Sequence, residues 1–222
     1  MEPSPLTRLR GTVAELHGRD PFAGGAPAAP EVVWCDFTDA ALVLGSHQSG
    51  DAVDPAAITA AGLSVVRRRS GGGAVLLRPG AVLWVDLVIP AGFWPDDVRA
   101  SMVRAGELWR GALDDPALRV HAGGMVVTPW SAVVCFAGVG PGEVLAGARK
   151  LVGLSQRRTR YGAWIQGLVH RRPLVAATGA LMHTDLAGAP PEAALADANP
   201  ERVIRALRAQ LEVVENTRSH LA

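Results

Sequence analysis

Three arginines, a serine and three glycines stand between two apolar runs, and this stretch constrains the fold more than any other. Residues 65–77 read Val-Val-Arg-Arg-Arg-Ser-Gly-Gly-Gly-Ala-Val-Leu-Leu. Consecutive glycines lack a Cβ and adopt positive φ readily, so they interrupt regular structure and expose neighbouring N–H groups. Such groups can form a concave anion site, to which arginines add fixed charge and forked donors. The stretch predicts a loop that binds phosphate or carboxylate; the alternative is a glycine-rich hairpin with a solvated basic edge.

Lysine usage gives a second constraint. The chain has 22 basic residues, and Lys150 is the only lysine among them. An ammonium is a compact donor with a tunable pKa, whereas a guanidinium is a wide planar fork. A single lysine in a chain so rich in arginine indicates a task that only a primary amine performs; chance retention is the alternative.

Length and composition bound the remaining possibilities. The 222 residues are 49% hydrophobic and predict one domain, residues 1–222, with a core that needs no crosslinks. No apolar run approaches the ~18–20 residues of a membrane helix, and the N-terminal sequence resembles no secretory signal. Cys35 and Cys135 match no metal-binding spacing, so we expect no metal and a reduced, cytoplasmic setting. The net charge of +1 gives no support for nucleic-acid binding.

Hydrophobic periodicity predicts an α+β fold. Helices are expected over residues 5–17, 55–61 and 96–113, and from Asn199-Pro200 onward, where an N-cap precedes a first-turn proline. Expected strands are 32–37, 41–44, the segment leading into the arginines, 74–77, 81–89, 120–127, 132–136, 149–154 and 163–170. Strands outnumber helices and often follow one another directly, which favours a mixed sheet over a βαβ arrangement.

Three short sequence motifs follow one another along the chain. Residues 44–48 read Leu-Gly-Ser-His-Gln, residues 67–75 read Arg-Arg-Arg-Ser-Gly-Gly-Gly-Ala-Val, and residues 149–157 read Arg-Lys-Leu-Val-Gly-Leu-Ser-Gln-Arg. Together they resemble the Leu-Gly-x-x-Gln step, the arginine–glycine signature and the lysine segment of the lipoate–protein ligase and octanoyltransferase family. That family shares its catalytic fold with biotin–protein ligase. The resemblance implies a mixed, largely antiparallel β-sheet flanked by helices.

The resemblance also implies roles for single residues. Lys150 would contact the acyl carbonyl and phosphate, and Gln48 would lie near the mouth of the cleft. The expected substrate-binding residues are Gln48, Arg67, Arg68, Ser70, Gly71, Gly72, Gly73, Ala74, Gly153, Ser155, Gln166 and Gly167. Donors fixed where negative charge develops would stabilise that charge during acyl transfer.

Cys135 bears on the reaction type. It precedes Lys150 by fifteen positions and is followed by Phe136, a short glycine-rich loop and Glu143. Cysteine-dependent octanoyltransferases resemble this arrangement; there the thiolate accepts the octanoyl group from acyl carrier protein as a thioester. A nearby ammonium lowers a thiol pKa, so Lys150 could activate Cys135 as the nucleophile. The alternative is a small buried hydrophobe at a strand end, which is how we interpret Cys35.

Two departures from the family's pattern are visible. Gln166-Gly167 stands where the family often has His-Gly, and Leu77-Arg78 replaces the His-Asp pair after the glycine motif. Glutamine forms hydrogen bonds but cannot exchange protons near neutral pH as histidine does. We do not expect His47 or His121 to substitute.

The resemblance predicts an enzyme that acylates a lysine of a lipoyl carrier domain, of a 2-oxoacid dehydrogenase or of the glycine-cleavage protein. Lipoate or octanoate would be the acyl substrate, with no permanently bound cofactor. The family's long ligases carry a C-terminal accessory domain for which 222 residues leave no room, so a transferase is favoured. The alternatives are a ligase that uses ATP and Mg, or lipoyl-adenylate, and a non-catalytic relative that binds acyl groups or adenylates; biotin transfer ranks last.

Overall fold

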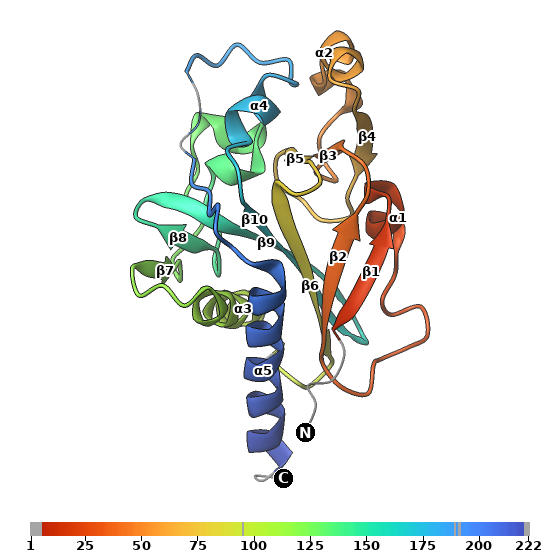
Figure 1. Cartoon of the computed structure of the whole chain (residues 1–222), viewed down its shortest axis with the longest axis vertical. Coiled ribbons are helices and arrows are strands. Elements are labelled where there is room, and N and C mark those ends of the chain that lie inside the picture. The colour runs from red at the N-terminus through yellow and green to blue at the C-terminus, as the bar shows by residue number, and fades with distance from the viewer. Residues whose placement is uncertain (1–5, 95, 189, 191, 220–222) are drawn as a thin grey trace.

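A computed structural model describes residues 6–94, 96–188, 190 and 192–219 of the chain (Figure 1). The α-helices are α1 (Val13–Gly18), α2 (Pro55–Ala60), α3 (Val98–Leu113), α4 (Val175–Gly179) and α5 (Pro200–Ser219), and the 3-10 helices are η1 (Gly50–Ala52), η2 (Pro129–Ala132) and η3 (Cys135–Ala137). The strands are β1 (Thr7–Gly11), β2 (Glu31–Phe37), β3 (Ala41–Leu44), β4 (Ser64–Arg67), β5 (Val75–Leu77), β6 (Val82–Pro90), β7 (Leu118–Val120), β8 (Val144–Ala146), β9 (Arg149–Thr159) and β10 (Gly162–His170).

The described strands form two sheets. The larger has the order β1-β2-β6-β10-β9-β8-β7, in which β1 and β2 run parallel and the other neighbours run antiparallel. The smaller has the order β4-β3-β5, with β3 parallel to β4 and antiparallel to β5. This topology confirms the predicted α+β fold with a mixed, largely antiparallel sheet flanked by helices.

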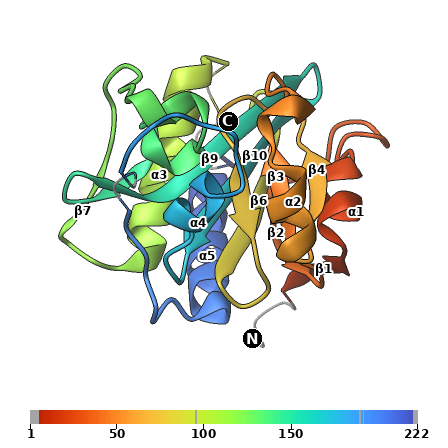
Figure 2. The same cartoon turned by 90° about the horizontal axis from the view of Figure 1, so that it is seen from above.

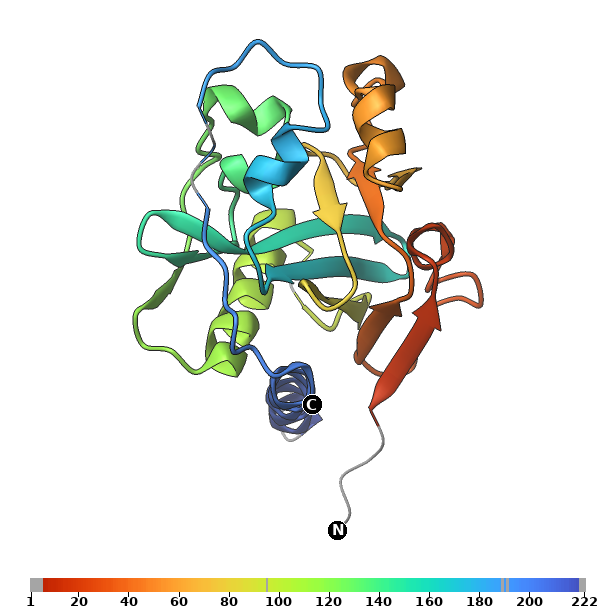
Figure 3. The same cartoon turned by 45° about the horizontal axis from the view of Figure 1, so that its top comes forward.

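The two faces of the larger sheet bury different sets of side chains. Along β6, Leu83, Val85 and Leu87 lie in one core cluster with residues of α3 and α5, while Val82 and Trp84 lie in the other cluster. This alternation is the two-residue period of a strand buried on both faces. Figure 2 shows β3, β4 and α2 grouped on the side of β6 away from α3. Helix α5, seen nearly end-on in Figure 3, packs beside α3.

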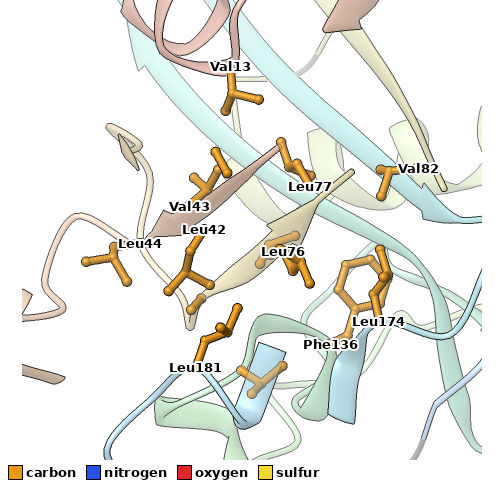
Figure 4. Close-up of a cluster of buried hydrophobic side chains, with 14 of the residues drawn as sticks. Val13, Leu42, Val43, Leu44, Leu76, Leu77, Val82, Phe136, Leu174 and Leu181 are labelled. Carbon is orange, nitrogen blue, oxygen red and sulfur yellow. The ribbon is translucent and has the colours of Figure 1, made fainter. Parts of the chain in front are cut away.

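The smaller sheet packs its apolar side chains against η3 and α4 (Figure 4). The labelled members of this cluster are Val13, Leu42, Val43, Leu44, Leu76, Leu77, Val82, Phe136, Leu174 and Leu181, all buried. Burying one such leucine stabilises the fold by roughly 1.5–3 kcal/mol. The cluster therefore fixes η3, which begins at Cys135, against the end of the arginine–glycine loop.

The predicted helix over residues 5–17 is wrong within the described chain, which begins after Pro5. Strand β1 occupies residues 7–11, and the short helix α1 begins only at Val13. Thr12 caps α1 through a capping box with Glu15, whose Oε2 accepts from the Thr12 N–H at 2.7 Å. Apolar residues at helical spacing thus belong partly to a strand, and the capping box marks where the helix really starts.

The predicted strands over 120–127 and 132–136 are also wrong. Only the short β7 and single bridges, Val126 to Val139 and Ala74 to Val134, form there. Pro129 opens η2, and Ser131 caps it by accepting the Thr128 N–H at 2.7 Å, so the chain turns instead of extending. The other predicted helices and strands are confirmed, with β9 running on to Thr159. Among the helices described, none combines the length and apolarity that crossing a membrane requires.

Candidate active site

Arg67 and Gln48 fasten the loop after β3 to its surroundings. The Nη1 of Arg67 donates to the carbonyl oxygen of Gly45 at 3.1 Å and also to that of Gln48. The side-chain Nε2 of Gln48 donates to the carbonyl oxygens of Ala132 and Val133 at 3.0 and 3.1 Å. Both predicted substrate-binding residues therefore hold backbone in this structure, and they bring the Leu-Gly-x-x-Gln block against η2.

Arg68 organises the glycine triplet from within. Its side chain is buried, and its Nη2 donates to the carbonyl oxygens of Gly71 at 2.7 Å and Gly73 at 2.8 Å. Gly72 between them has φ +96°, a conformation that favours glycine. A Cβ placed on Gly72 would lie 3.6 Å from the Sγ of Cys135. The glycine loop and the cysteine are therefore neighbours.

Close backbone contacts explain why the loop needs glycine on both sides. A Cβ on Gly45 would lie 1.9 Å from the carbonyl oxygen of Gly72, and one on Gly73 would lie 2.7 Å from the backbone nitrogen of Cys135. Real Cβ atoms do not approach backbone so closely, so each position requires hydrogen in place of a side chain. The N–H of Cys135 donates to the carbonyl oxygen of Ala74 at 3.0 Å, which continues the contact.

Lys150 reaches the site because β9 carries a β-bulge. Leu145 pairs with Lys150 and Val144 pairs with Val152, so Leu151 is an extra residue in β9. Leu151 and Val152 both lie in the core cluster under α3 and α5, whereas Lys150 contacts η3 on the opposite face. Strict alternation from Val152 would have put Lys150 under the helices. Bulges are known to redirect side chains in this way.

Two acceptors hold the Lys150 ammonium. Its Nζ donates to the carbonyl oxygen of Cys135 at 2.5 Å and to Oε1 of Glu143 at 2.9 Å, and it lies 5.2 Å from the centre of the Phe136 ring. Lys150 and Glu143 are each 4% exposed, so the ion pair is buried. The other carboxylate oxygen of Glu143 accepts the N–H of Gly140 at 2.7 Å. Lysine and cysteine, distant in the sequence, are therefore joined directly.

An apolar pocket lies between the two sheets beside these residues. Its lining residues are His17, Val43, Arg68, Val75, Leu77, Trp84, Cys135, Phe136, Gly153, Leu154, Ser155, Gln166 and Leu168. The gaps between atoms along the pocket, together with its open mouth and the solvent there, amount to about 420 Å³. The wall is mostly hydrocarbon and aromatic, with a few polar groups among them, which is the usual composition of a small-molecule site.

The glycine loop is tied to the sheet floor of this pocket. Ser70 Oγ donates to Ser155 Oγ at 3.1 Å, and Ser155 pairs with Gln166 across β9 and β10. Gly153 lies two residues before Ser155 in β9 and leaves room for Phe136. A Cβ added to Gly153 would lie 3.0 Å from two atoms of the Phe136 ring. Gly167 points to the opposite face, where a Cβ would lie 2.5 Å from Nε1 of Trp109. It therefore serves the packing of α3 on the sheet.

His17 also lines the pocket, which no pattern in the sequence predicted. Its ring stacks on Trp84 with 4.4 Å between ring centres, and its Nδ1 lies 3.5 Å from Nε2 of Gln166. The Nε2 of His17 is buried and has no hydrogen-bond partner among the described residues. Burial, and secondarily the charge of Arg68, lowers the pKa of His17 to about 3. The ring is therefore neutral at physiological pH.

Asp86 anchors the ring on which His17 stacks. It is fully buried on β6 and accepts the indole N–H groups of Trp84 at 2.7 Å and Trp164 at 2.8 Å. Arg19, just after α1, donates to the same carboxylate at 2.6 Å. Burial raises the pKa of Asp86, while the Arg19 charge and the two indoles act in the opposite direction. The charged partner and two donors satisfy a group that would otherwise be costly to bury.

The chain matches one family over most of its length. A model of the lipoyl protein ligase A/B catalytic domain matches residues 25–183, which include the arginine–glycine loop, Cys135 and Lys150. This chain belongs to that family. The predicted family resemblance is therefore confirmed, and the chain is a lipoate–protein ligase-like catalytic domain. No curated protein is significantly similar to it in sequence.

Solved structures agree with the family assignment. Lipoate–protein ligase A bound with ATP is 16% identical with a TM-score of 0.72, covering 95% of this chain and 84% of the other. The putative lipoate protein ligase Ta0514 of T. acidophilum with bound lipoic acid is 18% identical with a TM-score of 0.71, covering 95% and 85%. A bipartite ligase studied with its E2 lipoyl domain from Thermoplasma acidophilum is 16% identical, with a TM-score of 0.68 and coverage of 95% and 82%. At such identities these likenesses establish the lipoyl ligase fold.

The sequence did not predict the roles of three residues at or near the pocket. His17 reaches it, and Asp86 supports its wall through Trp84, by long-range packing of α1 on β6 that no local pattern reveals. In the family's pattern Glu143 only stands between the cysteine and the lysine segment, yet in the structure it holds Lys150. A glutamate seven positions before the only lysine was visible in the sequence, but its burial beside the ammonium was not. Cys35 is buried, as expected for a core residue, and burial raises the pKa of its thiol well above the ordinary value.

Proposed function

We propose that this chain transfers an octanoyl or lipoyl group to a lysine of a lipoyl carrier domain through a thioester on Cys135. One observation carries the proposal: Cys135 lines the apolar pocket, and the Lys150 ammonium hydrogen-bonds to the carbonyl of the same residue at 2.5 Å. A hydrocarbon-lined pocket accommodates an acyl tail, and a thiol beside a fixed positive charge is suited to acyl transfer.

The reaction would proceed in two steps, acylation of Cys135 and then transfer of the acyl group to the acceptor lysine. The Cys135 thiolate attacks the thioester carbonyl of acyl carrier protein, and the tetrahedral intermediate collapses to the Cys135 thioester and the carrier's free thiol, which takes a proton. The ε-amine of the acceptor lysine then attacks the Cys135 thioester. An amide forms, the Cys135 sulfur leaves, and the proton lost by the amine restores the thiol. Lys150 and the N–H groups of the glycine loop would stabilise the negative oxygen in both steps.

Apart from Ala74 and Gly167, the predicted substrate-binding residues divide into two groups in this proposal, while Gly167 packs against Trp109 of α3. Arg68, Gly153, Ser155 and Gln166 would line the acyl pocket. Arg67, Gln48, Ser70 and the glycines 71–73 would keep the loop in the shape that meets the acyl group, since Arg67 and Gln48 hydrogen-bond to backbone and Ser70 to Ser155. Ala74 would hold the Cys135 N–H, as its backbone bond indicates.

The acceptor we propose is a lipoyl domain of a 2-oxoacid dehydrogenase or of the glycine-cleavage protein. Support comes from the similar bipartite ligase of Thermoplasma acidophilum, which was analysed together with its E2 lipoyl domain. We further propose that residues 1–222 form one catalytic domain and that the protein acts in the cytoplasm.

A ligase that activates lipoate with ATP and Mg is the second candidate. The similar lipoate–protein ligase A was solved with ATP, and Ta0514 was solved with lipoic acid. In a ligase the Lys150 ammonium would face the phosphate of an acyl-adenylate. The pairing with Glu143 reduces the charge available to a phosphate and to an oxyanion alike, so it is Cys135 in the pocket wall that favours the transferase.

An acylation assay separates these candidates. The purified chain would be incubated with octanoyl acyl carrier protein and an apo lipoyl domain, or with lipoate, ATP and Mg, and the lipoyl domain would be weighed by mass spectrometry. Transfer from the carrier protein that is lost in Cys135→Ser and Lys150→Ala supports the transferase. Modification only with ATP, unaffected by Cys135→Ser, supports the ligase. Absence of modification in both arms supports a non-catalytic relative and overturns the proposal.

A further inference from the structure

The pairing of β9 with β10 gives the pocket a direction. At one end Gly153 pairs with Leu168, and Gly153 lies against the ring of Phe136, next to Cys135. Two residues along the strands, Ser155 pairs with Gln166. A strand advances ~3.4 Å per residue, so the second pair lies ~7 Å further from the Phe136 end. An acyl tail attached at Cys135 would run along the floor toward Gln166.

His17 stands at the end of that path. Its Nδ1 lies 3.5 Å from the Gln166 amide, and its ring lies flat on Trp84 at 4.4 Å between centres, with 30° between the planes. Trp84 is 1% exposed and cannot shift freely, because its indole N–H is bonded to Asp86 at 2.7 Å. The imidazole is therefore backed by a fixed aromatic ring.

The chain that carries His17 is held from several sides. Arg19 is bound to Asp86 at 2.6 Å, and Nη2 of Arg69 donates to the carbonyl oxygen of Gly18 at 3.2 Å. Asp20 forms a further ion pair with Arg157 of β9 at 3.2 Å. The C-terminal end of α1 is thus fixed to β6, to the arginine run and to β9. A wall held in this way does not yield to a longer ligand.

We propose that His17 is the specificity-determining residue that ends the acyl pocket and sets the length of the acyl chain. The inference rests on the proposed function, because it takes the pocket to be the acyl site. An extra methylene beyond the length that fits must displace the stacked imidazole or leave the pocket. In a close-packed wall either event is costly, and a pocket typically discriminates ~10–200-fold per methylene.

Binding of free fatty acids to the full chain tests this assignment without requiring turnover. Hexanoate, octanoate, decanoate and dodecanoate would be titrated calorimetrically into the unaltered protein, His17→Ala and His17→Trp. We expect His17→Ala to improve the affinity for decanoate relative to octanoate by about tenfold or more. His17→Trp should shift the preference the other way, toward hexanoate. His183→Ala, a truncation of an exposed histidine outside the pocket, should leave the order of affinities unchanged.

Each outcome decides the question. If the affinity ratios between the acids are the same in both His17 variants as in the unaltered protein, the assignment is overturned. It is also overturned if His183→Ala changes these ratios as much as the His17 variants do. If His17→Ala does not fold, the His17→Trp variant alone decides, because its larger side chain would shorten the pocket. Failure of the unaltered protein to bind any of these acids would instead contradict the proposed function. Binding that shifts as expected, without transfer to a lipoyl domain, would support the assignment and refute the transferase.

Discussion

The Lys150 ammonium is buried, and one charged partner, Glu143, offsets most of the cost of burying it. Taking a lysine charge out of water costs several kcal/mol, and the buried Glu143 carboxylate 2.9 Å away offsets that cost. A guanidinium would be too wide for a site whose two acceptors converge on one nitrogen. This geometry gives a physical reason for a single lysine in a chain whose other basic residues are all arginine.

Variants of the buried Lys150–Glu143 pair distinguish its contribution to stability from its contribution to acyl transfer. Lys150→Ala leaves Glu143 unpaired, so we expect the free energy of unfolding in urea to fall by about 3–5 kcal/mol and acyl transfer to fall by about 10²–10³-fold. The double variant Lys150→Met with Glu143→Gln removes both charges, and we expect it to recover most of the stability but none of the transfer. Recovery of activity in the double variant would show that the ammonium has no role in the reaction.

His17 makes stability depend on pH. Its pKa in the folded chain is about 3, below the ordinary 6.5, so as pH falls the unfolded chain takes up the proton first. The stability that its neutral ring contributes is fully present above about pH 6.5 and is lost as pH falls toward 3. Between pH 7 and pH 5 the loss should be about 2 kcal/mol and should disappear in His17→Phe. Parallel urea-unfolding curves against pH for the two proteins would contradict this assignment.

At the scale of helices and strands, the sequence predicts those boundaries that neighbouring residues determine. Proline at the start of α2 and α5, and the glycines that follow β4, mark boundaries that the structure reproduces. The predicted N-terminal helix is wrong because Leu6, Leu9 and Val13 have helical spacing by coincidence, although the Thr12–Glu15 capping box is visible in the sequence. The pairing of β1 with β2, and the bulge in β9, depend on contacts distant in the sequence and leave no local mark.

The loop after β3 should tolerate no side chain at its first glycine. In Gly45→Ala the new Cβ would meet the carbonyl oxygen of Gly72, so we expect a loss of about 1–3 kcal/mol in the free energy of unfolding and a slower transfer rate. The matched control is Gly50→Ala, in the same connection, where an added Cβ meets nothing within 4 Å. Equal effects of the two substitutions, measured by urea unfolding and by the acylation assay, would refute the tight crossing of the two loops.

On the scale of the whole molecule, the site is assembled from both sheets and from α1. The arginine–glycine loop, Cys135 and Lys150 were predicted to converge, and the structure brings them together. The far end of the pocket could not be predicted, because His17 meets Trp84, and Arg19 meets Asp86, only after α1 has packed on β6. The sequence shows neither that packing nor the fact that the three arginines secure backbone around the pocket.

Asp86 should matter to the whole fold more than any surface carboxylate. Asp86→Ala leaves the buried end of Arg19 and two indole N–H groups unpaired, so we expect a loss of about 3–5 kcal/mol in the free energy of unfolding. Asp36 also binds arginines, at 2.6 and 2.7 Å, but those arginines are largely exposed. Asp36→Ala should therefore cost no more than about 1 kcal/mol. Thermal unfolding that ranks the two variants in the opposite order would refute the anchoring role.

The most direct measurement weighs the intact protein after incubation with octanoyl acyl carrier protein in the absence of any acceptor. The account predicts a mass increase of one octanoyl group, removed by hydroxylamine as a thioester is, located on the peptide that contains Cys135 and absent in Cys135→Ser. An unmodified protein that nevertheless octanoylates a lipoyl domain, or an adduct that persists in Cys135→Ser, would contradict the thioester on Cys135.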